Sequence, residues 1–185
     1  IFLYLLVISV AGLVYNIIVF PQNWRFKSFK DLPGSKNISM SAAWGIVTAV
    51  LPALNRDNSF NAALWVSFVF AFGIVFIRSA MSDILEIQSD KLIGQETIPV
   101  FFGRDHTIVI LRFMSLILLF VLIFAYPAGW ASVLSFFLPV CVLYLWICFM
   151  FCDRKPALSG AFKEGLLETS YIIAGFCVIL WHVFG

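Results

Sequence analysis

Three acidic residues stand at helical spacing where a long apolar run of this sequence ends. Asp83, Glu86 and Asp90 follow one another at i, i+3 and i+7, so a helix through them would carry all three carboxylates on one face. Clustered carboxylates are costly at a membrane boundary unless a cation neutralises them. Mg²⁺ suits such a cluster, because it binds through one or two carboxylates and usually bridges to phosphate oxygens. The spacing alone is equally consistent with a solvated helix end.

The residues around these carboxylates extend the pattern. Gly94 is expected to end the acidic helix, and residues 95–99 to return in an extended form towards the next apolar run. Two basic residues stand near the carboxylates, Arg78 five residues before Asp83 and Lys91 directly after Asp90. Arg78 could neutralise a carboxylate or contact a phosphate group, and Lys91 could contact a phosphate group. Either could instead anchor a helix at a membrane interface.

The elements that must position these side chains are strongly apolar. Of the 185 residues, 62% are hydrophobic and only 12% are charged, and the mean hydropathy is +1.01. A soluble domain carries about a quarter charged residues, so the composition excludes a water-soluble globular fold, a disordered chain and a disulfide-stapled secreted domain. The net charge of +2 is too small to indicate a nucleic-acid partner. The sequence predicts an all-α, multi-pass protein of the lipid bilayer that forms one domain over residues 1–185.

Six apolar runs are long enough to cross a membrane, since a spanning helix needs about 20 largely apolar residues. The predicted spans cover residues 1–24, 38–54, 58–77, 107–125, 130–152 and from about 163 to the end. Eleven of the twelve Lys and Arg residues fall in alternate loops, and Arg56 alone lies in another. Positive charge accumulates on the cytoplasmic side. The acidic segment is therefore predicted to be cytoplasmic in an integral membrane protein, in a bacterial inner membrane.

Residues 83–99 read D-x2-E-x3-D-x3-G-x2-T-x-P. This pattern closely resembles the second acidic motif of the UbiA superfamily of intramembrane prenyltransferases, D-x2-D-x3-D-x3-G followed by T-x-P. The family carries it between helices six and seven of a nine-helix bundle, so the resemblance covers the whole chain as the last six helices. Glu86 departs from the usual Asp, and Gln95 stands where Arg or Lys is common. The family's first motif, N-x3-D-x3-D, does not occur in these residues and is expected before Ile1.

The resemblance implies an enzyme that moves a polyprenyl group from an isoprenoid diphosphate to a small, often aromatic acceptor, as in quinone biosynthesis. In such an enzyme Mg²⁺ is held on the diphosphate by acidic residues. Here the implied metal ligands are Asp83, Glu86 and Asp90, with Asp83 and Asp90 as the catalytic pair.

The resemblance also implies roles for residues outside the acidic helix. Lys36, in another cytoplasmic loop, joins Arg78 and Lys91 as a predicted diphosphate contact. Tyr15 and Asn16, at the end of the first predicted span, would line the acceptor pocket, or would instead belong to an interfacial belt. With only one acidic motif, residues 1–185 by themselves are expected not to catalyse transfer.

A non-enzymatic membrane protein is the alternative, such as a transporter half or an assembly subunit that binds a cation at the acidic loop. The G-x2-T-x-P sequence after the acids favours the enzyme, because a generic cation site does not need it. Two further expectations concern single positions. Glu168, inside the last predicted span, requires a polar partner or a water-filled cavity. Cys148 and Cys152, four residues apart, are expected to pack rather than to bind a metal.

Overall fold

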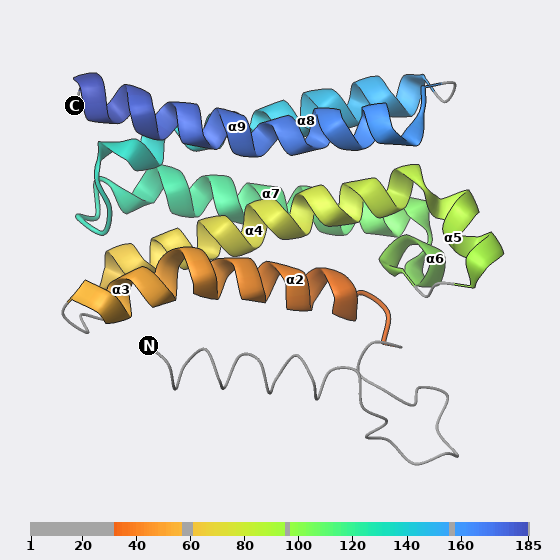
Figure 1. The fold of residues 1–185 in the computed structure, drawn as a ribbon, viewed down its shortest axis with the longest axis horizontal. Coiled ribbons are helices and arrows are strands. Elements are labelled where there is room, and N and C mark those ends of the chain that lie inside the picture. The colour runs from red at the N-terminus through yellow and green to blue at the C-terminus, as the bar shows by residue number, and fades with distance from the viewer. Residues whose placement is uncertain (1–31, 57–60, 95–96, 156–157, 185) are drawn as a thin grey trace, which may run out of the picture.

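The fold is an assembly of long helices that lie side by side (Figure 1). The computed structural model describes residues 32–56, 61–94, 97–155 and 158–184, and within these residues there are helices and no strands. Five helical spans in this part of the chain are long and apolar enough to cross a membrane: Ser35–Leu54, Ala62–Leu85, Arg104–Ala125, Val133–Arg154 and Gly160–Val183. The predicted all-α, multi-pass class is confirmed. The span predicted over residues 1–24 lies outside the described residues.

The first described span is built from three consecutive helical segments, α2 (Ser35–Gly45), the π-helical turn η2 (Ile46–Val50) and α3 (Leu51–Arg56). The widened turn ends next to Pro52, where the Leu51 N–H donates to the Ile46 carbonyl five residues earlier. Proline has no N–H, and its ring clashes with the carbonyl four residues back, which here belongs to Thr48. The π turn accommodates this proline without ending the span.

Helix α4 (Ala62–Leu85) is central and packs against α2, α7, α8 and α9. It begins after Asn61, whose side chain accepts a hydrogen bond of 3.0 Å from the Leu64 N–H. Gly73 allows close packing, because a Cβ there would lie 2.9 Å from Leu118 Cδ2 of α7. The helix extends beyond the predicted span over residues 58–77 and continues to Leu85, as expected for a helix through the acidic residues. It does so because Arg78 is buried against α9 rather than exposed at a helix end.

The acidic segment begins in the last turns of α4 and continues into the short helix α5 (Ile87–Ile93), and a second short helix, α6 (Ile98–Phe102), leads to α7 (Arg104–Ala125). Gly94 ends α5 in the left-handed conformation with φ of 77°, as predicted. The expected extended return over residues 95–99 is wrong at its end, since Ile98 and Pro99 form the first turn of α6. Proline is well suited there, because its fixed φ matches a helix and its missing N–H has no partner to lose. Only Thr97 is extended among the described residues of this stretch.

The last two spans pack against each other. They comprise the 3-10 turn η3 (Val133–Phe136), α8 (Pro139–Arg154) and α9 (Gly160–Phe184). The Tyr144 hydroxyl donates to the Leu166 carbonyl across this contact at 3.1 Å. Cys148 and Cys152 are free and buried in α8, which confirms that they pack. In Figure 1, α5 and α6 lie at one end of the bundle and the C-terminal end of α9 lies at the other.

Candidate functional site

The acidic segment bends at Glu86, where α4 ends and α5 begins. Helical hydrogen bonds continue across the bend, from the Glu86 N–H to the Ser82 carbonyl and from the Asp90 N–H to the Glu86 carbonyl. The three carboxylates do not share one environment, however. Asp83 and Asp90 are 6% and 7% exposed, whereas Glu86 is exposed. The three carboxylates therefore differ in exposure along a segment that bends at Glu86, and a single acidic face stays a prediction.

Asp83 is held by residues that begin α2. The Asn37 side-chain amide donates to Asp83 Oδ2 at 2.8 Å, and Asn37 Oδ1 accepts from the Ser79 hydroxyl at 3.3 Å. Lys36 Nζ lies 3.9 Å from Asp83 Oδ1. Asn37 is only 1% exposed, so its amide has no access to water and depends on these two partners. The structure thus brings the predicted phosphate contact Lys36 to the predicted metal ligand Asp83.

Asp90 is held by the chain that follows it. The Thr97 hydroxyl donates to Asp90 Oδ2 at 3.0 Å, and both residues are buried. The left-handed turn at Gly94 reverses the chain between them. Glycine adopts this conformation without the steric penalty of a Cβ atom. Gly94 of the sequence motif therefore turns the chain, and Thr97 of the motif orients the carboxylate of Asp90.

The acidic cluster of Asp83, Glu86 and Asp90 is close enough for electrostatic interaction among its members. Within the described residues, however, no three His, Cys, Asp or Glu side chains are grouped so that they could hold a metal ion between them. Magnesium needs only one or two carboxylates and fills its other positions with water and phosphate oxygens. The observed hydrogen bonds occupy Oδ2 of each buried aspartate, and Lys36 Nζ lies 3.9 Å from Oδ1 of Asp83, so a cation at Asp83 would share that oxygen with Lys36. The residues present fit Mg²⁺, and its binding stays a prediction.

Arg78 is paired with carboxylates of α9. Its Nη2 lies 2.8 Å from Glu168 Oε1 and 3.2 Å from Glu164 Oε1. The guanidinium is buried, and its Nε has no hydrogen-bond partner among the described residues. Glu168 therefore has the polar partner that its place inside a span requires. Contact between Arg78 and a diphosphate stays a prediction.

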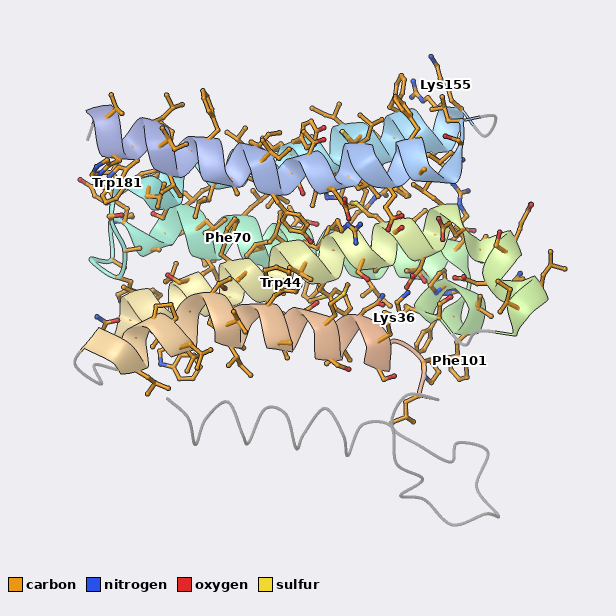
Figure 2. The ribbon with its side chains drawn as sticks, viewed as in Figure 1. Lys36, Trp44, Phe70, Phe101, Lys155 and Trp181 are labelled. Carbon is orange, nitrogen blue, oxygen red and sulfur yellow. The ribbon has the colours of Figure 1, made fainter. Side chains whose placement is uncertain are left out.

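The remaining predicted site residues are placed differently. Lys91 is exposed in the last turn of α5, beside the buried Asp90. Tyr15 and Asn16 lie outside the described residues. Figure 2 shows Lys36 towards the end of the bundle that carries α5 and α6, the same end as Phe101. The cluster thus receives side chains from two separate parts of the sequence.

A cavity of about 550 Å³ lies further along the bundle, between α2, α4, α9 and the segment around η3. Val75 marks its limit on α4 and stands eight residues before Asp83, which is about 12 Å along a helix. Most of its lining is apolar, and Trp44 and Phe70 belong to it. Figure 2 shows these two residues near the middle of the bundle's length. The cavity and the acidic cluster are therefore successive features along α4.

No protein-family model, curated protein or solved structure matches this chain. The resemblance to the UbiA superfamily accordingly stays a prediction from residues 83–99.

Three contacts at and near the acidic cluster were not predicted pair by pair from the sequence. Asn37 is the closest partner of Asp83, and Glu164 and Glu168 are the partners of Arg78. A signal was present for two of them. Asn37 is an amide at the start of an apolar run, and Glu168 is a carboxylate within one. Neither signal names a partner, because each contact joins helices distant in sequence.

Proposed function

We propose that this chain belongs to a membrane-embedded prenyltransferase that moves a polyprenyl group from an isoprenoid diphosphate to a small aromatic acceptor. The observation that carries the proposal is the convergence of Lys36 and Asn37 with Asp83 at one end of the bundle. A metal-bound diphosphate needs carboxylates for the cation and a basic group for the phosphate oxygens. These groups come from two segments of the chain, and Asn37 and Asp83 are 46 residues apart.

Asp83 and Asp90 are the residues that would hold Mg²⁺, with the exposed Glu86 at the edge of the same cluster. Magnesium bound there would neutralise the negative charge that develops on a departing diphosphate. The chain's own contribution is orientation. The Asn37 amide and the Thr97 hydroxyl each fix one oxygen of an aspartate, so that the other oxygen is presented in a constant direction.

The basic residues near the cluster have different tasks in this proposal. Lys36 is 62% exposed in its side chain, so it can follow a phosphate group that lies outside the buried carboxylates. Lys91 is exposed next to Asp90 and can approach from the α5 side. Arg78 is engaged by α9, and we assign it first to holding α4 and α9 together. The distribution of Lys and Arg supports a cytoplasmic location for this end of the bundle, and the inner membrane of a bacterium is the proposed membrane.

The proposal is tested by donor binding in membranes that contain the complete protein. The probe is geranylgeranyl thiodiphosphate, an isoprenoid diphosphate whose sulfur resists cleavage, titrated with and without Mg²⁺. Asp83→Asn and Asp90→Asn should each weaken Mg²⁺-dependent binding at least tenfold, because each removes a carboxylate charge from the cation site. Asp105→Asn is the matched control, because Asp105 is an exposed acid in the first turn of α7.

If Asp83→Asn and Asp90→Asn both bind the donor analogue as tightly as the unaltered protein, these carboxylates do not hold the donor. Mg²⁺ binding that depends on Asp83 and Asp90 without any donor binding would instead favour the non-enzymatic alternative. In that case the acidic loop is a cation site of a transporter or of an assembly subunit.

A further inference from the structure

A basic side chain outside the acidic cluster lies well inside one of the membrane-spanning helices. Arg112 stands eight residues after Arg104, where α7 begins, which is about 12 Å along a helix. The 22 residues of α7 extend for about 33 Å, and the hydrocarbon core of a bilayer is about 30 Å thick. Arg112 is therefore expected at a depth where a cation needs a partner.

The contact that the structure gives to Arg112 is an aromatic ring. The guanidinium carbon lies 6.0 Å from the centroid of the Trp146 ring of α8. Among the described residues, Arg112 forms no ion pair with a carboxylate and donates no hydrogen bond. The ring attracts the positive charge, but it supplies none of the oxygen acceptors that the N–H groups of a guanidinium require. These N–H groups remain for an acceptor from outside the described residues.

The Trp146 indole that contacts Arg112 is held in place by its neighbours. Its Nε1–H donates to the Ser115 hydroxyl at 2.9 Å, and this bond joins α8 to α7. The Phe149 ring lies nearly perpendicular to the indole, with 5.9 Å between the ring centroids. The guanidinium therefore has a defined place on the surface formed by α7 and α8. Arg112 is exposed on this surface, so a ligand can reach it.

The adjoining ends of α7 and α8 carry an excess of positive charge. Arg104 of α7 is paired with Asp153 of α8, which places these two ends side by side. Residues 104–112 and 153–155 contain four basic and two acidic side chains, so this region attracts anions. Figure 2 shows Lys155 at the end of the bundle that carries α5 and α6, which is the end predicted to be cytoplasmic.

The surface beside this cation is apolar. Phe113, next to Arg112, is 66% exposed, and Ile147, next to Trp146, is 67% exposed. Such side chains are suited to contact with lipid acyl chains, and a phospholipid supplies both these chains and phosphate oxygens that accept hydrogen bonds from arginine. The net positive charge favours a lipid with a net negative headgroup, because a zwitterionic headgroup brings a cation of its own.

We propose that Arg112 and Trp146 form the headgroup end of a site for an anionic phospholipid. The lipid phosphate accepts hydrogen bonds from the Arg112 guanidinium, and the acyl chains lie along α7 and α8. The inference goes beyond prenyl transfer and does not depend on it. It concerns the surface of α7 and α8, whereas the diphosphate would lie at the acidic cluster of α4 and α5.

The test is native mass spectrometry of the complete protein, freed of lipid in detergent and then titrated with one phospholipid at a time. The lipids are palmitoyl-oleoyl phosphatidylglycerol and palmitoyl-oleoyl phosphatidylcholine, which have the same chains and differ in the net charge of the headgroup. Phosphatidylglycerol should bind about fivefold more tightly, which corresponds to the attraction of one basic residue for an anionic lipid. Arg112→Gln should reduce this preference to less than about twofold.

Two further sets of variants separate this site from general surface charge. Arg154→Gln is the matched control, because Arg154 is an exposed basic residue at the end of α8, and this variant should retain most of the preference. Trp146→Leu should weaken the binding of phosphatidylglycerol severalfold, since it removes the ring that holds the guanidinium. Trp146→Phe should weaken it less, because phenylalanine keeps an aromatic ring.

Equal binding of the two lipids by the unaltered protein would overturn the proposal, and this comparison needs no variant to fold. A preference that survives Arg112→Gln, or that Arg154→Gln removes equally well, would also overturn it and would indicate general attraction by surface charge. Displacement of phosphatidylglycerol by an equal concentration of glycerol phosphate would show a site for a free phosphate and not for a lipid. Absence of any bound lipid would mean that another part of the complete protein covers this surface.

Discussion

The hydrogen bond between Asn37 and Asp83 should be a measurable source of stability. Its length is 2.8 Å, its two partners are 1% and 6% exposed, and it joins α2 to α4. Hydrogen bonds between membrane helices average about 0.6 kcal/mol in double-mutant cycles, with a maximum near 1.7 kcal/mol. When Asp83 is ionised the acceptor is charged, and bonds to charged groups contribute about 1.5–3 kcal/mol. We therefore expect a coupling energy near the membrane maximum, about 1.5 kcal/mol.

The measurement is a double-mutant cycle of Asn37→Ala and Asp83→Ala in the complete protein, without Mg²⁺. Unfolding in detergent is followed by circular dichroism, and the coupling energy is the part of the double-mutant effect that the single changes do not account for. Ser79→Ala is the control, because it removes the longer hydrogen bond of 3.3 Å to Asn37. It should lower the free energy of unfolding by less than about 1 kcal/mol. A coupling energy of about 0.3 kcal/mol or less would refute the reasoning, because it would mean that the buried contact adds nothing beyond its separate parts.

Three further predictions concern packing, the buried ion pair and the second aspartate. Gly73→Ala should destabilise the protein by about 1–3 kcal/mol, because the new methyl group would lie 2.9 Å from Leu118 of α7. Gly165→Ala should not destabilise it, since a Cβ there meets nothing within 4 Å. Equal melting temperatures of the two variants would contradict the close packing at Gly73. Glu168→Gln should destabilise the protein by about 1 kcal/mol after allowance for exposure, and Glu164→Gln by less, because the contact of Glu168 with Arg78 is the shorter one. If denaturant unfolding gave the opposite order, it would count against this pairing. Thr97→Val should weaken Mg²⁺-dependent donor binding severalfold and Thr97→Ser should not, because serine keeps the hydroxyl that orients Asp90. Equal affinities of the two variants for the donor would show that the Thr97 hydroxyl does not have this role.

The membrane-spanning architecture was predictable because it depends on local properties of the chain. An apolar run of sufficient length satisfies its own backbone hydrogen bonds as a helix, whatever its neighbours are. The predicted spans over residues 38–54 and 107–125 accordingly fall within the observed spans Ser35–Leu54 and Arg104–Ala125. The helix end at Gly94 was equally predictable, since a left-handed helix end favours glycine regardless of tertiary contacts.

Residues near charged positions were harder to place from sequence. Arg78 directly follows the predicted span over residues 58–77, and α4 continues for seven more residues beyond it. A charged residue ends a span only if it remains in water, and here α9 supplies two carboxylates to Arg78. The bend at Glu86 is a similar case, because an ideal helical spacing does not reveal where two helices meet.

The sequence by itself therefore determined the class of fold, most of the helical spans and the residue types available at the acidic segment. Only the tertiary structure decided which groups meet. Asp83 and its amide partner are 46 residues apart, and Arg78 and Glu168 are 90 apart. No periodicity in the chain encodes such a distance, because the packing of whole helices brings these side chains together. The cavity has the same origin, since it is a space left between elements and belongs to none of them.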